Sequence, residues 1–199
     1  MSSLKVRRIG VLASGRGSNL AALLSADLSP ASIVCVLSDK AAAPALDLAR
    51  QAGVEVVQHL APKPFAGDRA AYDASVTAAL REAGVDFVCL AGYMRLVSPG
   101  FVADWRGRMI NIHPSLLPSF KGLDAQAQAI AAGVKLAGCT VHYVSEEMDA
   151  GEIIAQAAIE VLPGDTAASL SERLLPVEHR LYVETVQKLV RSTATAQSS

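Results

Sequence analysis

The 199-residue sequence contains few of the residues that mark specialised classes of protein. Its three cysteines, Cys35, Cys89 and Cys139, form no CxxC pair, which argues against a disulfide framework and against a zinc site. Cys35 and Cys89 lie within apolar runs, where a free thiol usually behaves as a small buried hydrophobic group. We therefore expect a reduced, cytoplasmic protein.

The sequence also lacks a strong excess of charge and a long apolar segment. Its formal net charge of -1 gives no reason to expect binding to nucleic acid or to an anionic membrane. The apolar stretch after Arg8 is too short for a signal peptide, and no segment is long enough to span a bilayer. With 51% hydrophobic and 19% charged residues, the composition is typical of a folded globular protein. The expected partners are small molecules, and the protein is expected to be a monomer or a homodimer.

Short β-branched segments alternate with alanine-rich segments of helical period in the first half of the chain. This alternation predicts an α/β fold built from βαβ units around a mainly parallel sheet. The expected strands cover residues 8–13, 33–37, 54–57, 87–91 and 108–113. The expected helices cover residues 18–25, 43–52, 68–83 and 99–105.

The pattern changes after the fifth expected strand. Two longer strands follow, and we expect them to pair with each other. The elements expected here are a proline-bracketed loop at residues 114–122, a helix near 124–132, strands at 139–144 and 153–161, and a final helix at 167–190. Pro176 should bend this final helix or end it early, because proline removes a helical hydrogen bond.

The length of the chain favours one domain. We assign that domain to residues 1–190, with a frayed start over residues 1–5. Residues 191–199, rich in Ser, Thr and Ala, are expected to form a disordered tail.

A glycine-rich segment, Ser14 to Asn19, follows the first expected strand and opens the first expected helix. Backbone N–H groups and the positive end of the helix can bind phosphate there, and glycine allows close approach. The segment matches neither a Walker A loop nor a full GxGxxG pattern. A tight turn with Ser18 as the helix N-cap therefore explains it almost as well.

The segment MINIHP contains the most informative pair of polar residues in the chain. Side chains alternate along a strand, so Asn111 and His113 should project from the same face. Ligands of parallel sheets bind beyond the carboxyl ends of the strands, where this pair is expected to lie. An amide beside an imidazole suits a developing oxyanion and can exchange protons near neutral pH. The alternative is a buried, hydrogen-bonded histidine with Asn111 in a turn.

The segment SEEMDAG joins the two late strands and contains several acidic residues. Acidic loops are usually solvated, and this is the interpretation for Glu146 and Glu147. Asp149 differs because it precedes two small residues that allow close backbone packing. A carboxylate near an imidazole would orient it and favour its protonated form. The residues alone do not show that Asp149 reaches His113, and His142 in the preceding strand is either a supporting group or a core residue.

Four segments in this order, SGRGSN, AGYMRLVSP, INIHPSLLPSFKG and HYVSEEMDAGEII, resemble the folate-dependent formyltransferase family. The resemblance extends from about Arg8 to Val190. It implies a single-domain, Rossmann-like α/β fold, with helices on both faces of a mostly parallel sheet and a late antiparallel strand pair. It also implies transfer of the formyl group of 10-formyltetrahydrofolate, without a metal, to the amine of 5'-phosphoribosylglycinamide in purine biosynthesis.

The resemblance implies a role for each matching residue. Asn111 and protonated His113 would stabilise the tetrahedral oxyanion, His113 would donate a proton to the folate nitrogen, and Asp149 would keep His113 charged. The residues implied to bind phosphoribosylglycinamide are Gly17, Ser18, Asn19 and Glu178. The residues implied to bind the folate are Arg69, Met94, Arg95, Leu96, Val97, Asn111, Ser145, Glu146, Glu147, Met148 and Asp149.

The sequence departs from the family pattern in two places. Residues 123–126 read LDAQ where many members carry histidine, and Pro176 lies just before the substrate-binding Glu178. Methionyl-tRNA formyltransferases and formyltetrahydrofolate hydrolases resemble the chain too, but they carry additional domains. A nucleotide-binding oxidoreductase or a binding module is the alternative from another class, and it would use Asp39 to bind a ribose.

Overall fold

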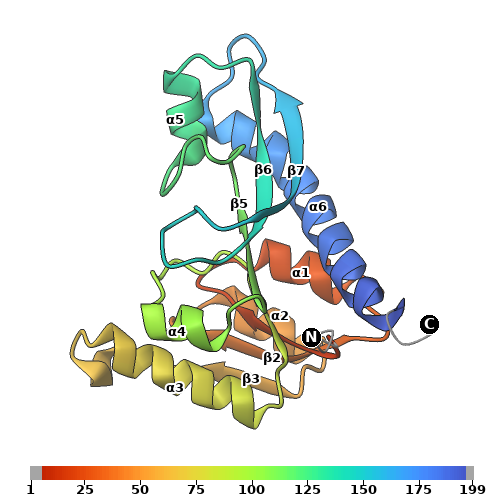
Figure 1. Ribbon diagram of the computed structural model, residues 1–199. Helices are drawn as coiled ribbons and strands as arrows, with labels where there is room; N and C mark the ends of the chain where they lie inside the picture. Colours follow the sequence, from red (N-terminus) through yellow and green to blue (C-terminus); the bar gives the residue numbers. More distant parts are fainter. Residues whose placement is uncertain (1–5, 196–199) are drawn as a thin grey trace.

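The computed structural model describes residues 6–195, which form an α/β fold around one seven-stranded sheet. The strand order is β3-β2-β1-β4-β5-β6-β7 (Figure 1). The strands are β1 (Arg8–Leu12), β2 (Ser32–Ser38), β3 (Val56–His59), β4 (Phe87–Leu90), β5 (Met109–His113), β6 (Leu136–Tyr143) and β7 (Ile153–Glu160). The first five pair in parallel, whereas β6 is antiparallel to both of its neighbours. The predicted fold class is confirmed.

Helices cover both faces of the parallel part of the sheet. They are α1 (Ser18–Leu24), α2 (Pro44–Gln51), α3 (Arg69–Glu82), α4 (Pro99–Asp104), α5 (Ala125–Ala131) and α6 (Ala167–Thr195), with a 3-10 turn η1 (Lys63–Phe65) before α3. One apolar core includes Leu20, Ala45 and Tyr182 from α1, α2 and α6. A second core includes Tyr72 and Phe101 from α3 and α4. The central strands are buried from both sides, which explains their continuous apolar sequences.

The late antiparallel strands extend the sheet beyond its parallel part. Figure 1 shows β6, β7 and α5 extending away from α3 and α4, with the long helix α6 running alongside both parts. β6 begins at Leu136, earlier than expected, because Leu136 and Ala137 pair with Glu160 and Ile159 of β7. The carboxyl end of β5 therefore lies where the parallel and antiparallel parts of the sheet meet.

The structure corrects two expectations about the last helix, an early end at Pro176 and a disordered tail that starts at residue 191. Pro176 does not end α6, which continues on both sides of it. Leu174 before the proline and Tyr182 after it are fully buried, so packing along the helix outweighs the loss of one hydrogen bond. The helix also passes Val190 and reaches Thr195, so residues 191–195 of the expected tail are helical. Residues 1–5 and 196–199 lie outside the described residues.

Within residues 6–195, no helix combines the length and the apolar character needed to cross a membrane.

Candidate active site

Asn111 and His113 lie on the same face of β5, next to the carboxyl end of the strand. The antiparallel register with β6 sets Asn111 opposite His142 and His113 opposite Thr140. The loop after β6 brings Asp149 to this face, and its Oδ2 lies 3.4 Å from Nδ1 of His113. Three polar side chains from two distant segments therefore meet at the edge where ligands of α/β sheets bind.

The loop between β5 and α5 fixes the orientation of His113 and Asp149. Nε2 of His113 donates a hydrogen bond to the carbonyl oxygen of Phe120 at 2.9 Å, so Nδ1 is the nitrogen that faces the carboxylate. Oδ2 of Asp149 accepts a hydrogen bond from the backbone N–H of Gly122 at 2.9 Å. The side chains of His113 and Asp149 are 6% and 12% exposed, so solvent screens their interaction only weakly. A protonated His113 would donate from both ring nitrogens.

His142, for which the sequence left open a supporting role or a place in the core, contacts this group. Its Nδ1 donates to the carbonyl oxygen of Tyr143 at 2.9 Å, and burial lowers the pKa of the ring. The ring is therefore neutral near pH 7, and its Nε2 accepts a hydrogen bond from Nδ2 of Asn111 at 3.4 Å. The same Nε2 lies 3.8 Å from Oδ1 of Asp149. Its contact with Asn111 follows from the strand register, which the sequence does not give.

The glycine loop and α6 bring the residues expected to bind the ribonucleotide together. Gly17, and not Ser18, is the N-cap of α1, and its φ is 78°. Ser18 is the first residue of the helix, and no side chain caps this end. Asn19 is buried, and its Nδ2 donates to Oε2 of Glu178 at 3.5 Å. Burial raises the pKa of the Glu178 carboxyl.

Oδ1 of Asn19 is buried and has no hydrogen-bond partner among the described residues. Buried polar groups in proteins are rarely left unpaired. Beside a carboxylate that is itself buried, such an oxygen is suited to receive hydrogen bonds from a bound molecule.

Residues 94–97, expected to bind the folate, form an exposed loop beside α3. Met94 and Leu96 are 68% and 57% exposed, so this loop presents apolar side chains to solvent. The Arg95 guanidinium lies 4.4 Å from the centre of the Tyr72 ring, and Val97 packs on the second core. Arg69 is exposed at the start of α3, one helical turn before Tyr72, and therefore on the same side of that helix as Arg95.

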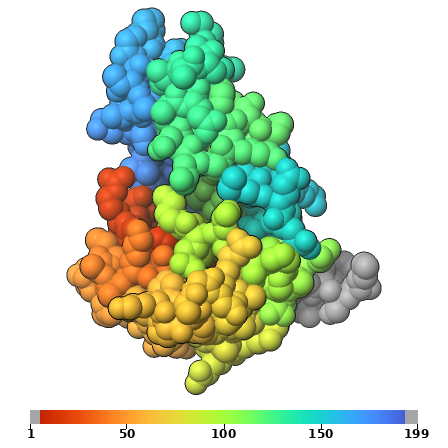
Figure 2. Space-filling model, turned by 90° about the vertical axis from the view of Figure 1, so that its left-hand side faces the viewer, coloured from red at the N-terminus to blue at the C-terminus, as the bar shows by residue number. Residues whose placement is uncertain are grey.

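The loop over residues 145–151 borders the site on the other side. Ion pairs join Glu147 to Lys121 at 2.9 Å and Glu146 to Arg106 at 3.7 Å. The hydroxyl of Ser145 donates to the carbonyl oxygen of Glu147, and Met148 is half-exposed. Figure 2 looks onto the side that carries these segments and shows the early red, yellow-green, green and cyan regions bordering the centre of this face.

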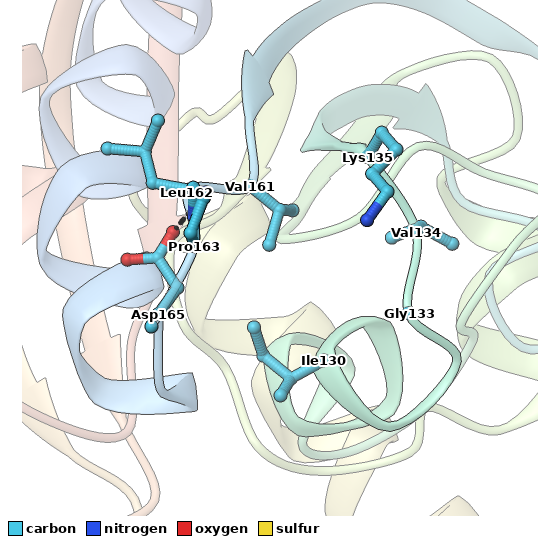
Figure 3. A pocket seen from close by; sticks show the side chains of 9 residues that line it. Ile130, Gly133, Val134, Lys135, Val161, Leu162, Pro163 and Asp165 are labelled. Carbon is cyan, nitrogen blue, oxygen red and sulfur yellow. Dashed lines mark hydrogen bonds between the residues drawn. The ribbon is translucent and has the colours of Figure 1, made fainter.

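Two cavities away from these segments contain none of the predicted residues. The larger has a volume of about 430 Å³ and lies between α5, the start of β6 and the end of β7 (Figure 3). Its walls include Ile130, Val134 and Val161, with Lys135 and Asp165 as the charged residues. Asp165 already accepts a hydrogen bond from the backbone N–H of Leu162, shown as a dashed line in Figure 3.

No group of three or more His, Cys, Asp and Glu side chains that could hold a metal ion occurs in the described part of the chain.

Comparison with known proteins agrees with this geometry. The family model described as formyl transferase matches residues 7–186, which include the glycine loop, Asn111, His113, Asp149 and Glu178. The chain belongs to the formyl transferase family.

Individual relatives give a narrower similarity. The chain is 40% identical over 191 residues to the phosphoribosylglycinamide formyltransferase of Bacillus subtilis, which covers 93% of this chain and 95% of that protein. It is 49% identical over 195 residues to the trifunctional purine biosynthetic protein adenosine-3 of Bos taurus, but spans only 19% of that protein's length. The crystal structure of glycinamide ribonucleotide transformylase 1 from Symbiobacterium toebii superposes with a TM-score of 0.89 at 47% identity, covering 94% of this chain and 89% of the other.

Proposed function

We propose that this protein transfers the formyl group of 10-formyltetrahydrofolate to the amine of 5'-phosphoribosylglycinamide, giving formylglycinamide ribonucleotide and tetrahydrofolate. The observation that carries the proposal is the meeting of Asn111, His113 and Asp149 at the edge of the sheet. The similarity to named phosphoribosylglycinamide formyltransferases over nearly the whole length of the chain supports the choice of acceptor.

Asn111 and His113 supply donors for the charge that develops on the formyl oxygen. Attack of the amine on the formyl carbon forms a tetrahedral intermediate with an oxyanion. The Asn111 amide has two hydrogens, and His142 accepts one of them, which leaves the second for the oxyanion. The second donor is the Nδ1–H of a protonated His113, because its 3.4 Å separation from Oδ2 of Asp149 is too long for a strong hydrogen bond and leaves the proton available to the oxyanion. Donors held in place before the reaction stabilise such an intermediate because they need no reorganisation.

Proton transfer completes the reaction. The attacking nitrogen loses one proton, and the folate nitrogen gains one as the bond between it and the formyl carbon breaks. His113 donates the proton to the leaving nitrogen, and Asp149 stabilises the charged ring and accepts the proton of the amine through water. No step requires a metal.

Each substrate has its own set of contacts in the proposal. Gly17, Ser18 and Asn19 bind the phosphate and sugar of the ribonucleotide, and Glu178 holds its amine end. Met94, Leu96, Val97 and the loop from Ser145 to Asp149 enclose the pterin, while Arg69 and Arg95 suit the carboxylates of the folate.

We further propose that residues 1–190 act as one formyltransferase domain in the cytoplasm. The three cysteines are free and buried, and burial raises the pKa of each thiol to about 12, so all three should stay reduced and unreactive.

The test is an assay of 10-formyltetrahydrofolate consumption with and without phosphoribosylglycinamide. Consumption that requires the ribonucleotide, with formylglycinamide ribonucleotide as the product, supports the proposal. Equal loss of the formyl group without an acceptor would identify a hydrolase instead. No consumption in either condition would overturn the proposed reaction.

A further inference from the structure

Ser14 connects the two loops that border the proposed substrate sites. It is 2% exposed and is the first residue of the glycine-rich segment Ser14 to Asn19, the glycine loop. Its backbone N–H donates to the carbonyl oxygen of Gly92 at 3.1 Å, and its Oγ accepts from the backbone N–H of Met94 at 2.9 Å. One residue therefore makes two hydrogen bonds to the loop over residues 92–97.

Asp39 orients the hydroxyl group of Ser14. Oγ of Ser14 donates its single proton to Oδ1 of Asp39 at 2.6 Å. With the proton directed there, the lone pairs of the hydroxyl are available to the N–H of Met94. A hydrogen bond to a carboxylate is shorter and stronger than one between neutral groups, so it holds the hydroxyl in this orientation. Asp39, considered above as a possible ribose ligand, therefore has one carboxylate oxygen engaged by Ser14.

Both connected loops have exposed residues beside these hydrogen bonds. Gly15 and Arg16 are exposed on one side of Ser14, and the glycine loop is held against α2 by a bond from the N–H of Ala45 to the carbonyl oxygen of Gly15. Met94 and Leu96 are exposed on the other side. A ligand that orders one loop would therefore act on the other through Ser14.

We propose that Ser14 and Asp39 are positioning residues that hold the glycine loop and the 92–97 loop in one relative arrangement, so that binding of ribonucleotide and binding of folate strengthen each other. The inference rests on the proposed function, which assigns one substrate to each loop. The restriction of loop motion that accompanies binding of the first substrate lowers the entropic cost of binding the second. Such coupling between binding sites must be reciprocal.

The experiment measures the KM of each substrate at a low and at a saturating concentration of the other. The coupling factor is the KM at the low concentration divided by the KM at saturation. Wild type should give a factor above one. In Ser14→Ala and Asp39→Ala the factor should fall to one, and both KM values at saturation should rise about fivefold, the change expected for one lost hydrogen bond. kcat should change less, because neither residue touches the reacting atoms.

Two further variants distinguish a positioning role from a general loss of structure. Asp39→Asn keeps an oxygen that can accept from Ser14, so it should retain most of the coupling. Ser38→Ala is the matched control: Ser38 is also buried, and its Oγ accepts from the backbone N–H of Lys40 rather than from the 92–97 loop. It should leave the coupling factor as in wild type.

A wild-type factor of one, unchanged coupling in both alanine variants, or an equal loss in Ser38→Ala would overturn the inference. If Ser14→Ala does not fold, Asp39→Ala and Asp39→Asn decide the question alone. Failure of the proposed function is a distinct result, because wild type would then not consume the ribonucleotide at all.

Discussion

Nδ2 of Asn111 lies 3.4 Å from Nε2 of His142, across the antiparallel pair of β5 and β6. The two residues are 31 positions apart in sequence and face each other because the register pairs them directly. The contact directs one amide hydrogen away from the reacting atoms and leaves the amide in a fixed orientation. The catalytic group thus depends on a neutral imidazole outside the expected set.

Replacing His142 should therefore impair Asn111 without removing it. In His142→Ala the amide loses its acceptor and can rotate, and kcat should fall about tenfold, the effect of one lost hydrogen bond on the transition state. His142→Gln offers an oxygen acceptor and should recover part of the rate. Steady-state kinetics of the three proteins checks this, and a kcat in His142→Ala equal to that of wild type would contradict it.

The same contact predicts a pH dependence. Burial lowers the pKa of His142 below its usual value of 6.5, so the ring accepts the Asn111 hydrogen bond at neutral pH. Protonation at lower pH converts Nε2 into a donor and breaks the contact. The acidic limb of the kcat profile should include this loss, and it should weaken in His142→Gln, whose side chain does not titrate. Identical acidic limbs in both proteins would argue against this role.

The two oxyanion donors should contribute unequally. Asn111→Ala removes a neutral donor and should lower kcat by roughly 10²–10³. His113→Ala removes both a donor and the group that protonates the leaving nitrogen, so it should cost several orders of magnitude with a modest change in substrate affinity. Single-turnover rates and substrate Kd values separate the two effects. Near-normal turnover in His113→Ala would refute its assignment.

Glu178 should lower the stability of the fold at neutral pH while it contributes to substrate binding. Burial raises the pKa of its carboxyl above the usual value of 4.5. At a pH between the pKa of the unfolded chain and that of the folded protein, the folded protein holds a proton that the unfolded chain releases. Unfolding is then favoured as pH rises, and this contribution to stability is lost as pH passes through the folded pKa. Glu178→Gln has no such loss.

Urea unfolding at pH 4 and pH 7 tests this sign. The variant should gain stability relative to wild type at the higher pH, while its KM for phosphoribosylglycinamide increases. The expectation would be contradicted if the stability of Glu178→Gln minus that of wild type were smaller at pH 7 than at pH 4.

Gly17 should tolerate no side chain. Its φ of 78° is unfavourable for other residues, and a Cβ would lie 2.8 Å from the Cβ of Ala45. Gly17→Ala should destabilise the fold by about 1–2 kcal/mol or more and raise the KM for the ribonucleotide. Gly15→Ala is the control, because a Cβ there meets nothing within 4 Å and its φ is not positive. Equal unfolding midpoints for the two variants would contradict the argument.

Much of the parallel sheet could be predicted from local patterns. The strands around Val11, Val36 and Cys89 are short apolar runs between helical segments, and that alternation is a property of neighbouring residues. The same holds for the shared face of Asn111 and His113, which follows from strand alternation. The early helix end that was one of the two effects expected of Pro176 did not occur, because α6 is held by packing against the sheet, which no local pattern reveals.

The sequence by itself determined the order of strands and helices, and it placed Asn111 and His113 side by side, because both depend on periodicities of 2 and 3.6 residues. Only the tertiary structure decided that Asp149 reaches His113, that His142 faces Asn111, and that Ser14 joins two loops. All three contacts join residues 31 to 80 positions apart. Such distances are set by strand register and loop path, which result from packing of the whole chain rather than from any one segment.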